Sequence, residues 1–147
     1  MSNTIPVTEI SKVFYARCGH KLAHLKEGHK CLNMHGEFYK ITLSFVQNLK
    51  PTYMSLNMIM DFDDIKEKFK FIENEIDHAF LISKNDPHLN QIKELGLKLV
   101  ILDYLPTVEY IAYWIYKKFK PIVPYLYKVT VVESKDNEAS YYEIPID

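Results

Sequence analysis

The chain of 147 residues is poor in cysteine and in glycine, and it has no long hydrophobic run. Its two cysteines, Cys18 and Cys31, are too few for the disulfide framework of a small secreted domain, so both are expected to be free thiols. No apolar stretch approaches the roughly 20 residues that a membrane-spanning helix requires. The first residues, MSNTIPVTEI, lack the basic and then apolar pattern of a signal peptide. These absences predict a cytoplasmic protein with no membrane partner.

The chain also lacks a surplus of either charge. Its 18 lysines and arginines nearly balance its 19 aspartates and glutamates, which leaves a formal net charge of −1. Without a basic surplus there is no electrostatic reason to expect a nucleic-acid partner. Internal repeats and low-complexity segments are absent as well. A length of 147 residues, 48% of them hydrophobic, fits one domain, residues 1–147, with a buried core.

Two strands and a long loop are predicted in the first third of the chain. Residues 5–17 are β-rich and are predicted as the first strand. Residues 37–46 alternate apolar and polar side chains, as a strand with one buried face does. Between them, residues 18–36 hold three of the four glycines and most of the histidines, so they are predicted to be mainly a functional loop.

Residues 61–76, DFDDIKEKFKFIENEI, are predicted as an amphipathic helix because their apolar residues recur at spacings of three and four. Three aspartates, Asp61, Asp63 and Asp64, lie at its start, where the helix dipole favours negative charge. Residues 83–103 are predicted to follow as a polar connection, a short helix and the β-like run LKLVIL.

A second amphipathic helix is predicted at residues 106–120, with Thr107 suited to cap its start. Residues 125–134 and 139–146 are predicted as two strands separated by the polar turn KDNE. The resulting order, β-β-α-α-β-β with extras, is typical of an α+β fold in which helices cover one face of an antiparallel sheet.

The stretch GHKCLNMHGEFY, residues 28–39, contains a candidate metal site. His35 and Glu37 are two residues apart, so on a strand their side chains point to the same face and could hold one ion. A third ligand could be His20, at the end of the first strand. Two histidines and one glutamate, with a fourth position open, form a known catalytic zinc ligand set. The alternative is a polar start to the strand, with an exposed histidine and glutamate.

Cys31 lies between His29, Lys30 and His35, an electropositive neighbourhood that favours a reactive thiolate. The alternative is a small buried residue, which is common for cysteine. Cys18, between Arg17 and Gly19, is interpreted as structural.

Two further features could carry chemistry. Asp77 is followed by His78, and a carboxylate beside an imidazole can orient it for proton transfer, although an exposed pair at a helix end is the commoner arrangement. Glu133 lies in the apolar run VTVVES on the same face as Val129 and Val131, where a carboxylate needs a partner. That partner could be a ligand with a guanidine-like edge or an internal lysine or arginine.

Taken together, these residues resemble the family of 6-pyruvoyltetrahydropterin and 6-carboxytetrahydropterin synthases. The resemblance runs from Phe14 to Tyr141 and rests on six pieces in the family's order: FYARCGHKL, EGHKCLNMHGE, NMIMDFDDIK, IDHAFL, LPTVEYIAYWI and VTVVES. It implies a T-fold (tunnelling fold) subunit, a four-stranded antiparallel sheet with two helices on one face. It further implies trimeric β-barrels stacked in pairs into a homohexamer, with active sites at subunit interfaces.

The resemblance also implies a zinc cofactor, which the family holds with three histidines. His20 and His35 match two of them, and Glu37 stands where the third would be. This departure adds a negative charge and raises the question of metal preference. Two milder departures are Asn57, in place of a usual glycine, and Ile82, in place of a common asparagine.

The remaining roles implied by the resemblance fall on five residues. Cys31 matches the catalytic cysteine, and Asp77 and His78 match the family's catalytic pair. Glu133 matches the glutamate that anchors the pterin, and Thr107 lies where family members contact it.

The activity implied first is that of a 6-carboxytetrahydropterin synthase of queuosine biosynthesis. Such a lyase converts 7,8-dihydroneopterin triphosphate to 6-carboxytetrahydropterin, acetaldehyde and triphosphate. Two alternatives stay open. One is a 6-pyruvoyltetrahydropterin synthase-type lyase, and the other is a pterin-binding paralogue with a weakened metal site and little catalysis.

Overall fold

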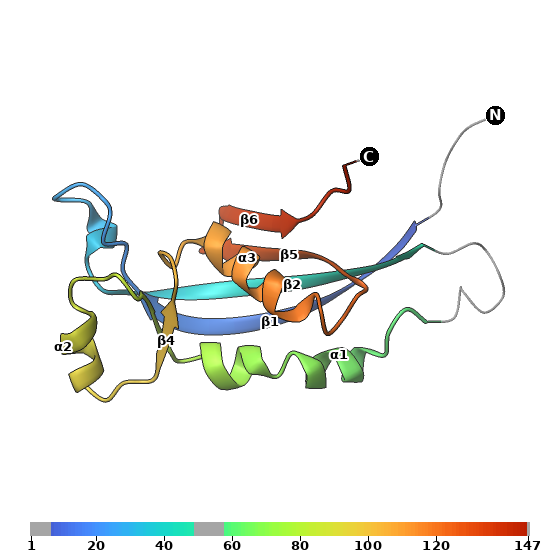
Figure 1. Ribbon diagram of the computed structural model, residues 1–147, viewed down its shortest axis with the longest axis horizontal. Coiled ribbons are helices and arrows are strands. Elements are labelled where there is room, and N and C mark those ends of the chain that lie inside the picture. The colour runs from blue at the N-terminus through green and yellow to red at the C-terminus, as the bar shows by residue number, and fades with distance from the viewer. Residues whose placement is uncertain (1–6, 49–57, 147) are drawn as a thin grey trace.

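The computed structural model describes residues 7–48 and 58–146 (Figure 1). Within these residues, six strands form one sheet in the order β4-β3-β1-β2-β5-β6. The strands are β1 (Val7–His20), β2 (His35–Asn48), β3 (Phe80–Ser83), β4 (Leu99–Leu102), β5 (Leu126–Glu133) and β6 (Asn137–Tyr142). The helical elements are η1 (Lys30–Leu32), α1 (Phe62–Lys68), η3 (Ile72–Ile76), α2 (Leu89–Glu94) and α3 (Val108–Phe119). The α+β class predicted from the sequence is confirmed.

The sheet is larger than the predicted four strands, and it is mixed. Strands β1, β2, β5 and β6 form the antiparallel part, while β3 pairs with β1 and β4 pairs with β3 in parallel. Each added strand has only four residues. β4 lies within the predicted β-like run LKLVIL, whereas β3 was not predicted, because four residues carry too little alternation to indicate a strand. The expected count of four strands came from the family resemblance, and the described sheet has six.

Strands β1 and β2 are longer at their shared end than predicted. Their ladder continues to the pair His20 and His35, so β1 extends beyond the predicted boundary at residue 17. The predicted loop of residues 18–36 therefore shortens to residues 21–34. Residues 18–20 belong to β1, and residues 35–36 belong to β2. In Figure 1 this loop and α2 lie at the end of the molecule opposite the start of β1.

Both predicted amphipathic helices cover the same face of the sheet. The side chains that meet there are fully or almost fully buried: Ala16, Ile41, Leu43, Phe45, Ile65, Phe69, Ile72, Ile111, Ile115, Phe119, Val129 and Val131. The opposite face keeps apolar side chains exposed, with Tyr15 stacked on Phe38 at 5.4 Å between ring centroids. The main core of the described residues thus lies on the side of the sheet that the two helices cover.

The predicted helix at residues 61–76 is interrupted. α1 ends at Lys68, and the wider π-helical turn η3 follows at Ile72–Ile76. Asp61 caps α1, since its Oδ1 accepts from the backbone N–H of Asp63 at 2.8 Å. Apolar residues keep their spacing across the interruption, so the sequence pattern alone does not reveal it.

Of the two milder departures from the family pattern, only Ile82 lies in the described residues. It is fully buried in β3, opposite Ile101 of β4, whereas Asn57 lies outside the described residues. Among the described helices, none combines the length and the apolarity that crossing a bilayer requires.

Candidate metal and active site

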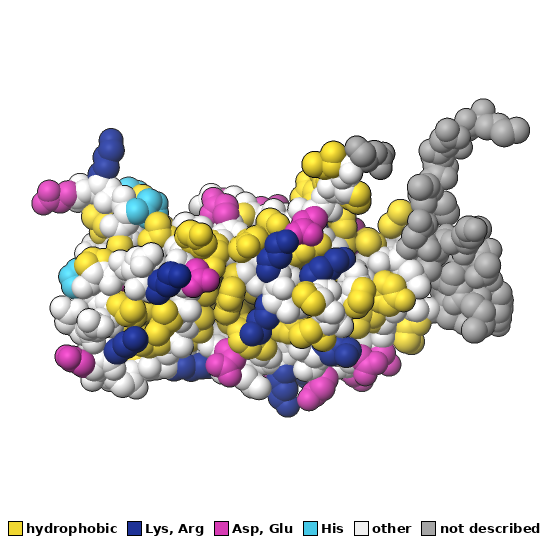
Figure 2. Space-filling model, in the orientation of Figure 1, with side chains coloured by type: hydrophobic (Ala, Val, Ile, Leu, Met, Phe, Trp, Pro, Cys, Tyr) yellow, Lys and Arg dark blue, Asp and Glu magenta, His cyan; other side chains and the backbone are white. Residues whose placement is uncertain are grey.

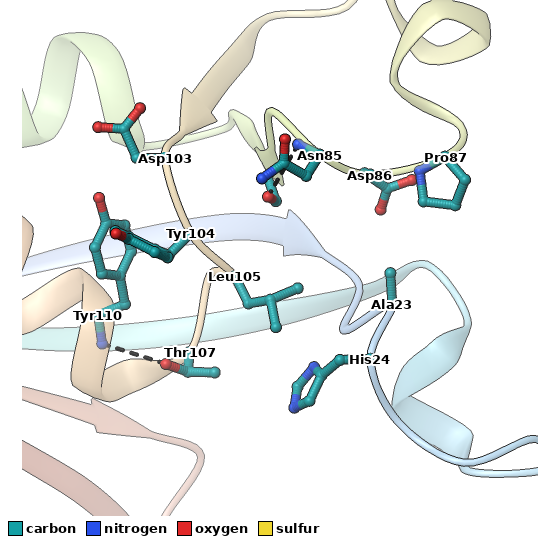
Figure 3. A pocket seen from close by; sticks show the side chains of 11 residues that line it. Ala23, His24, Asn85, Asp86, Pro87, Asp103, Tyr104, Leu105, Thr107 and Tyr110 are labelled. Atoms are coloured by element: carbon teal, nitrogen blue, oxygen red, sulfur yellow. Dashed lines mark hydrogen bonds between the residues drawn. The ribbon is translucent and has the colours of Figure 1, made fainter.

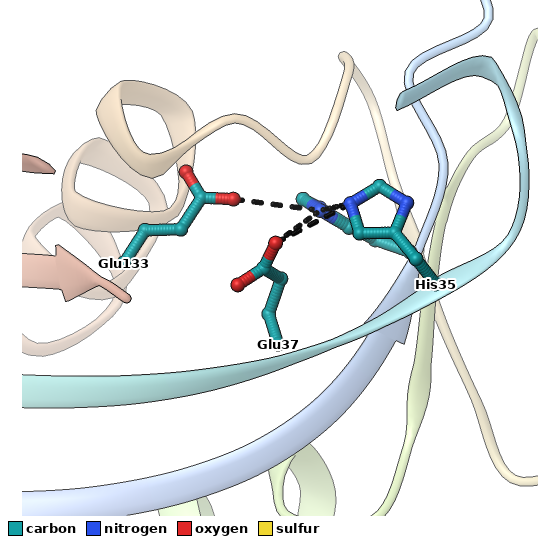
Figure 4. Close-up of side chains that lie close together, drawn as sticks. His35, Glu37 and Glu133 are labelled. Atoms are coloured by element: carbon teal, nitrogen blue, oxygen red, sulfur yellow. Dashed lines mark hydrogen bonds and ion pairs between the residues drawn. The ribbon is translucent and has the colours of Figure 1, made fainter. Parts of the chain in front are cut away.

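Four side chains converge at one end of the sheet: His20 from β1, His35 and Glu37 from β2, and Glu133 from β5 (Figure 4). One ligand atom from each lies within 4.8 Å of the others. Strand pairing explains the convergence, because His20 is the cross-strand partner of His35, and Glu133 is the partner of Tyr39, two residues after Glu37. All four side chains therefore extend from the face of the sheet that the helices cover. In Figure 2 the visible histidine side chains gather at this end of the molecule.

The distances within the cluster are short. His20 Nε2 and His35 Nε2 are 2.9 Å apart, and Glu37 Oε1 lies 3.4 Å from His35 Nε2 and 3.9 Å from His20 Nε2. Glu133 Oε1 lies 3.6 Å from His20 Nε2. A tetrahedral zinc ion with ligand bonds of about 2.0–2.1 Å separates its ligand atoms by about 3.3 Å. The spacing in the cluster is of that size.

The outer hydrogen bonds fix which nitrogen of each imidazole carries the proton. His20 Nδ1 lies 2.9 Å from the carbonyl oxygen of Pro106, and His35 Nδ1 lies 2.8 Å from that of Asn33. A carbonyl oxygen only accepts, so both Nδ1 atoms donate and both Nε2 atoms present lone pairs. Two lone pairs that face each other at 2.9 Å repel unless a cation lies between them. The donor set therefore fits a divalent metal ion.

Burial also prepares His20 as a neutral ligand. Its side chain is only 1% exposed, and burial lowers the pKa of the imidazole, despite the Pro106 hydrogen bond that opposes the shift. A histidine must be deprotonated at one nitrogen to bind a metal, so the lowered pKa favours binding at neutral pH.

Glu133 has an unusual electrostatic position. Burial, and then the charge of the neighbouring Glu37, raise the pKa of Glu133 to about 7. Within the part of the chain that the structure describes, no lysine or arginine forms an ion pair with Glu133. The internal basic partner that the sequence left open is therefore not observed. Two carboxylates next to each other favour a cation or a ligand with N–H donors.

Tyr39 is a positioning residue that the sequence pattern did not single out. Its side chain is fully buried, and its hydroxyl oxygen lies 3.1 Å from His20 Nδ1. Burial, and then the charge of Glu133, raise the pKa of the Tyr39 phenol, so it stays neutral. Its place two residues after Glu37 on the buried face is the only sequence signal that could have identified it.

Cys31 lies in the loop that joins β1 and β2, but outside the four-residue cluster. It belongs to the single turn η1, where its backbone N–H donates to His29 Nδ1 at 3.1 Å. Its carbonyl accepts from the N–H of Leu22 at 2.8 Å, which ties the turn to the start of the loop. The thiol is partly exposed, which leaves it accessible to a substrate.

Asp77 and His78 form the predicted pair, since His78 Nδ1 lies 2.8 Å from Asp77 Oδ2. The other carboxylate oxygen accepts from the backbone N–H of Arg17 at 2.7 Å, and His78 adopts a left-handed backbone with φ of 61°. Burial opposes the shift, but these hydrogen bonds from Arg17 and His78 lower the pKa of Asp77. His78 is 72% exposed, so the pair lies at the surface of the subunit.

Three hollows surround these groups. A cavity of about 580 Å³ is lined by His20, Glu133 and Thr107, together with residues of the β5–β6 turn. A second, of about 490 Å³, lies beside Gly19 and Gly36 and is lined by Glu37 and His78. Asp77–His78 therefore does not border the cavity that holds His20 and Glu133.

The third hollow, of about 510 Å³, adjoins the first and shares Thr107 and His24 with it (Figure 3). Thr107 caps α3 as predicted, with its hydroxyl oxygen accepting from the backbone N–H of Tyr110 at 3.2 Å. Tyr104 and Tyr110 form its aromatic side, with ring centroids 5.3 Å apart. The predicted pterin contact at Thr107 thus lies on the wall between two hollows.

Comparison with known proteins places the chain among enzymes of one class. The family model described as 6-pyruvoyl tetrahydropterin synthase matches residues 9–144. The chain therefore belongs to the 6-pyruvoyl tetrahydropterin synthase family.

Two similar proteins share the name of one particular enzyme. A 6-carboxy-5,6,7,8-tetrahydropterin synthase from Aquifex aeolicus is 29% identical over 130 residues, which cover 76% of this chain and 78% of the relative. A protein of the same name from Haemophilus influenzae is 32% identical over 106 residues, 67% of this chain and 75% of the relative.

Solved structures share the fold at lower sequence identity. An uncharacterized protein from Wolinella succinogenes superposes with a TM-score of 0.82 at 20% identity, covering 95% of this chain and 99% of the other. The 6-pyruvoyl tetrahydropterin synthase of Caenorhabditis elegans gives 0.69 at 22% identity, with 95% and 98% covered. These likenesses establish the T-fold predicted from the resemblance.

Proposed function

We propose that the protein is a 6-carboxytetrahydropterin synthase-like lyase that converts 7,8-dihydroneopterin triphosphate to 6-carboxytetrahydropterin, acetaldehyde and triphosphate. The observation that carries the proposal is the cluster of His20, His35 and Glu37, with both Nε2 lone pairs directed at one point, in a chain of this family. The names of the two relatives support the carboxytetrahydropterin product. The pathway served would be queuosine biosynthesis.

His20, His35 and Glu37 would hold the metal, which we propose to be zinc. When bound, zinc supplies a Lewis acid for the hydroxyl groups of the substrate's side chain. The carbonyl groups of Pro106 and Asn33 orient the two imidazoles, so the ligands are held before the ion arrives.

Glu133 and Thr107 would bind the pterin ring in the cavity that they share with His20. The aminopyrimidine edge of a pterin presents N–H donors, and a carboxylate accepts them through charge-assisted hydrogen bonds. The absence of a described lysine or arginine partner leaves the Glu133 carboxylate available for this role.

Cys31 would act as the base that removes a proton from the substrate's side chain, and Asp77–His78 would exchange protons during triphosphate elimination. In one subunit, His78 borders a different hollow from His20 and Glu133. We therefore propose that a neighbouring subunit completes the site, in a homohexamer built as a dimer of trimers.

Product analysis tests the proposal. Zinc-loaded protein incubated with 7,8-dihydroneopterin triphosphate should release acetaldehyde and 6-carboxytetrahydropterin, detected by mass spectrometry. A pyruvoyl product without acetaldehyde would assign the 6-pyruvoyltetrahydropterin synthase-type reaction. Pterin binding without turnover would instead support a paralogue with little catalysis, which Glu37 in place of histidine motivates.

A further inference from the structure

Glu133 lies as close to the metal-binding point as a ligand does. Its Oε1 is 3.6 Å from His20 Nε2. Glu37 Oε1 lies 3.4 Å from His35 Nε2 and 3.9 Å from His20 Nε2, so the Glu133 distance falls between these two values. In Figure 4 the carboxylates of Glu37 and Glu133 lie on the same side of the imidazoles, and both point toward them. Distance therefore does not separate Glu37, as a ligand, from Glu133, as a residue reserved for the pterin ring.

The two carboxylates make different contacts. Glu37 Oε2 lies 3.4 Å from the Ser134 hydroxyl, while Glu37 Oε1 faces the histidines. For Glu133, the only ion-pair contact in the described residues is the one with His20. Glu133 lies opposite the fully buried Tyr39 of β2, and its carboxylate, next to His20, lines the cavity.

We propose that Glu133 is a fourth, displaceable ligand of the metal. Without substrate, its carboxylate closes the coordination of an ion held by His20, His35 and Glu37. A pterin ring entering the cavity then draws the carboxylate onto its N–H donors and leaves a coordination position for the side-chain hydroxyl groups. The displacement rests on the proposed function, because it requires a pterin, whereas the ligand role does not.

The proposal gives Glu133 two partners that exclude each other. A carboxylate that accepts two N–H donors from a planar edge has both oxygens directed at that edge. Binding of the pterin ring and loss of the contact between Glu133 and the metal would then occur together. A coordination position for the side-chain hydroxyl groups would therefore be free only when the correct ring is bound. By thermodynamic linkage, a pterin that lacks side-chain hydroxyl groups should weaken metal binding, and the metal should weaken binding of that pterin by the same factor.

The ligand role is tested with cobalt(II) on the whole protein, by chelator competition and by visible absorption, which reports coordination. Glu133→Gln should weaken cobalt binding at least about tenfold and change the absorption spectrum. Glu138→Gln is the matched control, because Glu138 lines the same cavity but lies outside the cluster. Wild-type affinity and spectrum in Glu133→Gln would overturn the ligand role.

The displacement is tested on the wild-type protein with 6-methylpterin, which has the ring but no side-chain hydroxyl groups. Saturating 6-methylpterin should weaken cobalt binding and shift the spectrum toward that of Glu133→Gln. An unchanged or tighter cobalt affinity would overturn displacement. If 6-methylpterin does not bind at all, the proposed function and the displacement both fail, while the cobalt comparison still decides whether Glu133 is a ligand.

Discussion

In the proposed metal site, Glu37 would give a harder and more negative ligand set than three histidines would. Carboxylate oxygen suits manganese and magnesium better than imidazole nitrogen does, whereas imidazole favours zinc. Glu37→His should therefore shift the ratio of zinc to manganese affinity toward zinc, by roughly tenfold or more. Competition between the two metals, measured with a chelating dye, checks this. An unchanged ratio would mean that Glu37 is not a ligand.

The two cysteines should differ sharply in reactivity. Burial, and then the charge of Asp77, raise the pKa of the Cys18 thiol to about 12, and its Sγ donates to the Ile76 carbonyl at 3.2 Å. At pH 8 the folded protein should react with one equivalent of a thiol reagent such as Ellman's reagent, and the denatured protein with two. Cys31→Ala should abolish the native reaction, and Cys18→Ala should leave it unchanged. Labelling of Cys18 in the folded protein would contradict the burial described here.

Asp77 should contribute stability that depends on pH. Its pKa in the folded protein lies below the ordinary value of 3.8, so its contribution is present above pH 3.8 and is lost as pH falls through the folded pKa. Asp77→Asn should lower the free energy of unfolding at pH 7, and the difference from wild type should shrink as the pH falls below 3.8. Urea unfolding at several pH values measures it. An equal difference at all pH values would show that the charge is not the cause.

The candidate site was predictable where the chain places residues on one strand, and not where distant segments meet. Spacing alone brought His35 and Glu37 to one face, because strand side chains alternate. Pro106, whose carbonyl orients His20, is 86 residues away along the chain, so no local pattern indicates the contact. The same holds for the approach of Glu133 to His20, since it depends on which strand pairs with β2.

At the scale of elements, two glycines opposite each other in β1 and β2 should respond differently to substitution. A Cβ added at Gly19 would lie 2.7 Å from Phe80 Cδ2, whereas one added at Gly36 meets nothing closer than 3.9 Å. Gly19→Ala should therefore cost about 1–3 kcal/mol of stability through overpacking between β1 and β3. Gly36→Ala, the matched control, should be neutral or slightly stabilising. Thermal unfolding of both variants measures the difference, and equal losses would contradict the packing described.

The elements that sequence patterns predicted are those with a long and regular period. Residues 37–46 and 106–120 repeat their apolar positions over several turns or pleats, and they became β2 and α3. β4 falls in the run LKLVIL that was predicted to be β-like, but β3 was not predicted, because a strand of four residues shows no reliable period. The π-helical turn η3 was missed for a different reason, since Ile72 and Ile76 remain buried whether or not the helix is continuous.

At the scale of the whole molecule, a site shared between subunits predicts complementation. Cys31→Ala and His78→Ala should each be inactive as pure oligomers. After the two are unfolded and refolded together, about a quarter of the sites should combine an intact Cys31 from one subunit with an intact His78 from another, if chains mix randomly. Activity of the mixture measures this, and Cys31→Ala refolded with Cys31→Ser is the control. No recovery of activity would mean that both residues act within one chain.

The cross-strand pairing of His20 with His35 has a consequence for folding. A slip of one residue between β1 and β2 would turn one of the two imidazoles to the opposite face of the sheet. A metal ion that needs both imidazoles would then bind only the correct register, so its binding free energy would be added to the native alignment and withheld from slipped ones. The ion proposed for the chemistry would therefore also stabilise the native register of the β1–β2 hairpin against slipped registers.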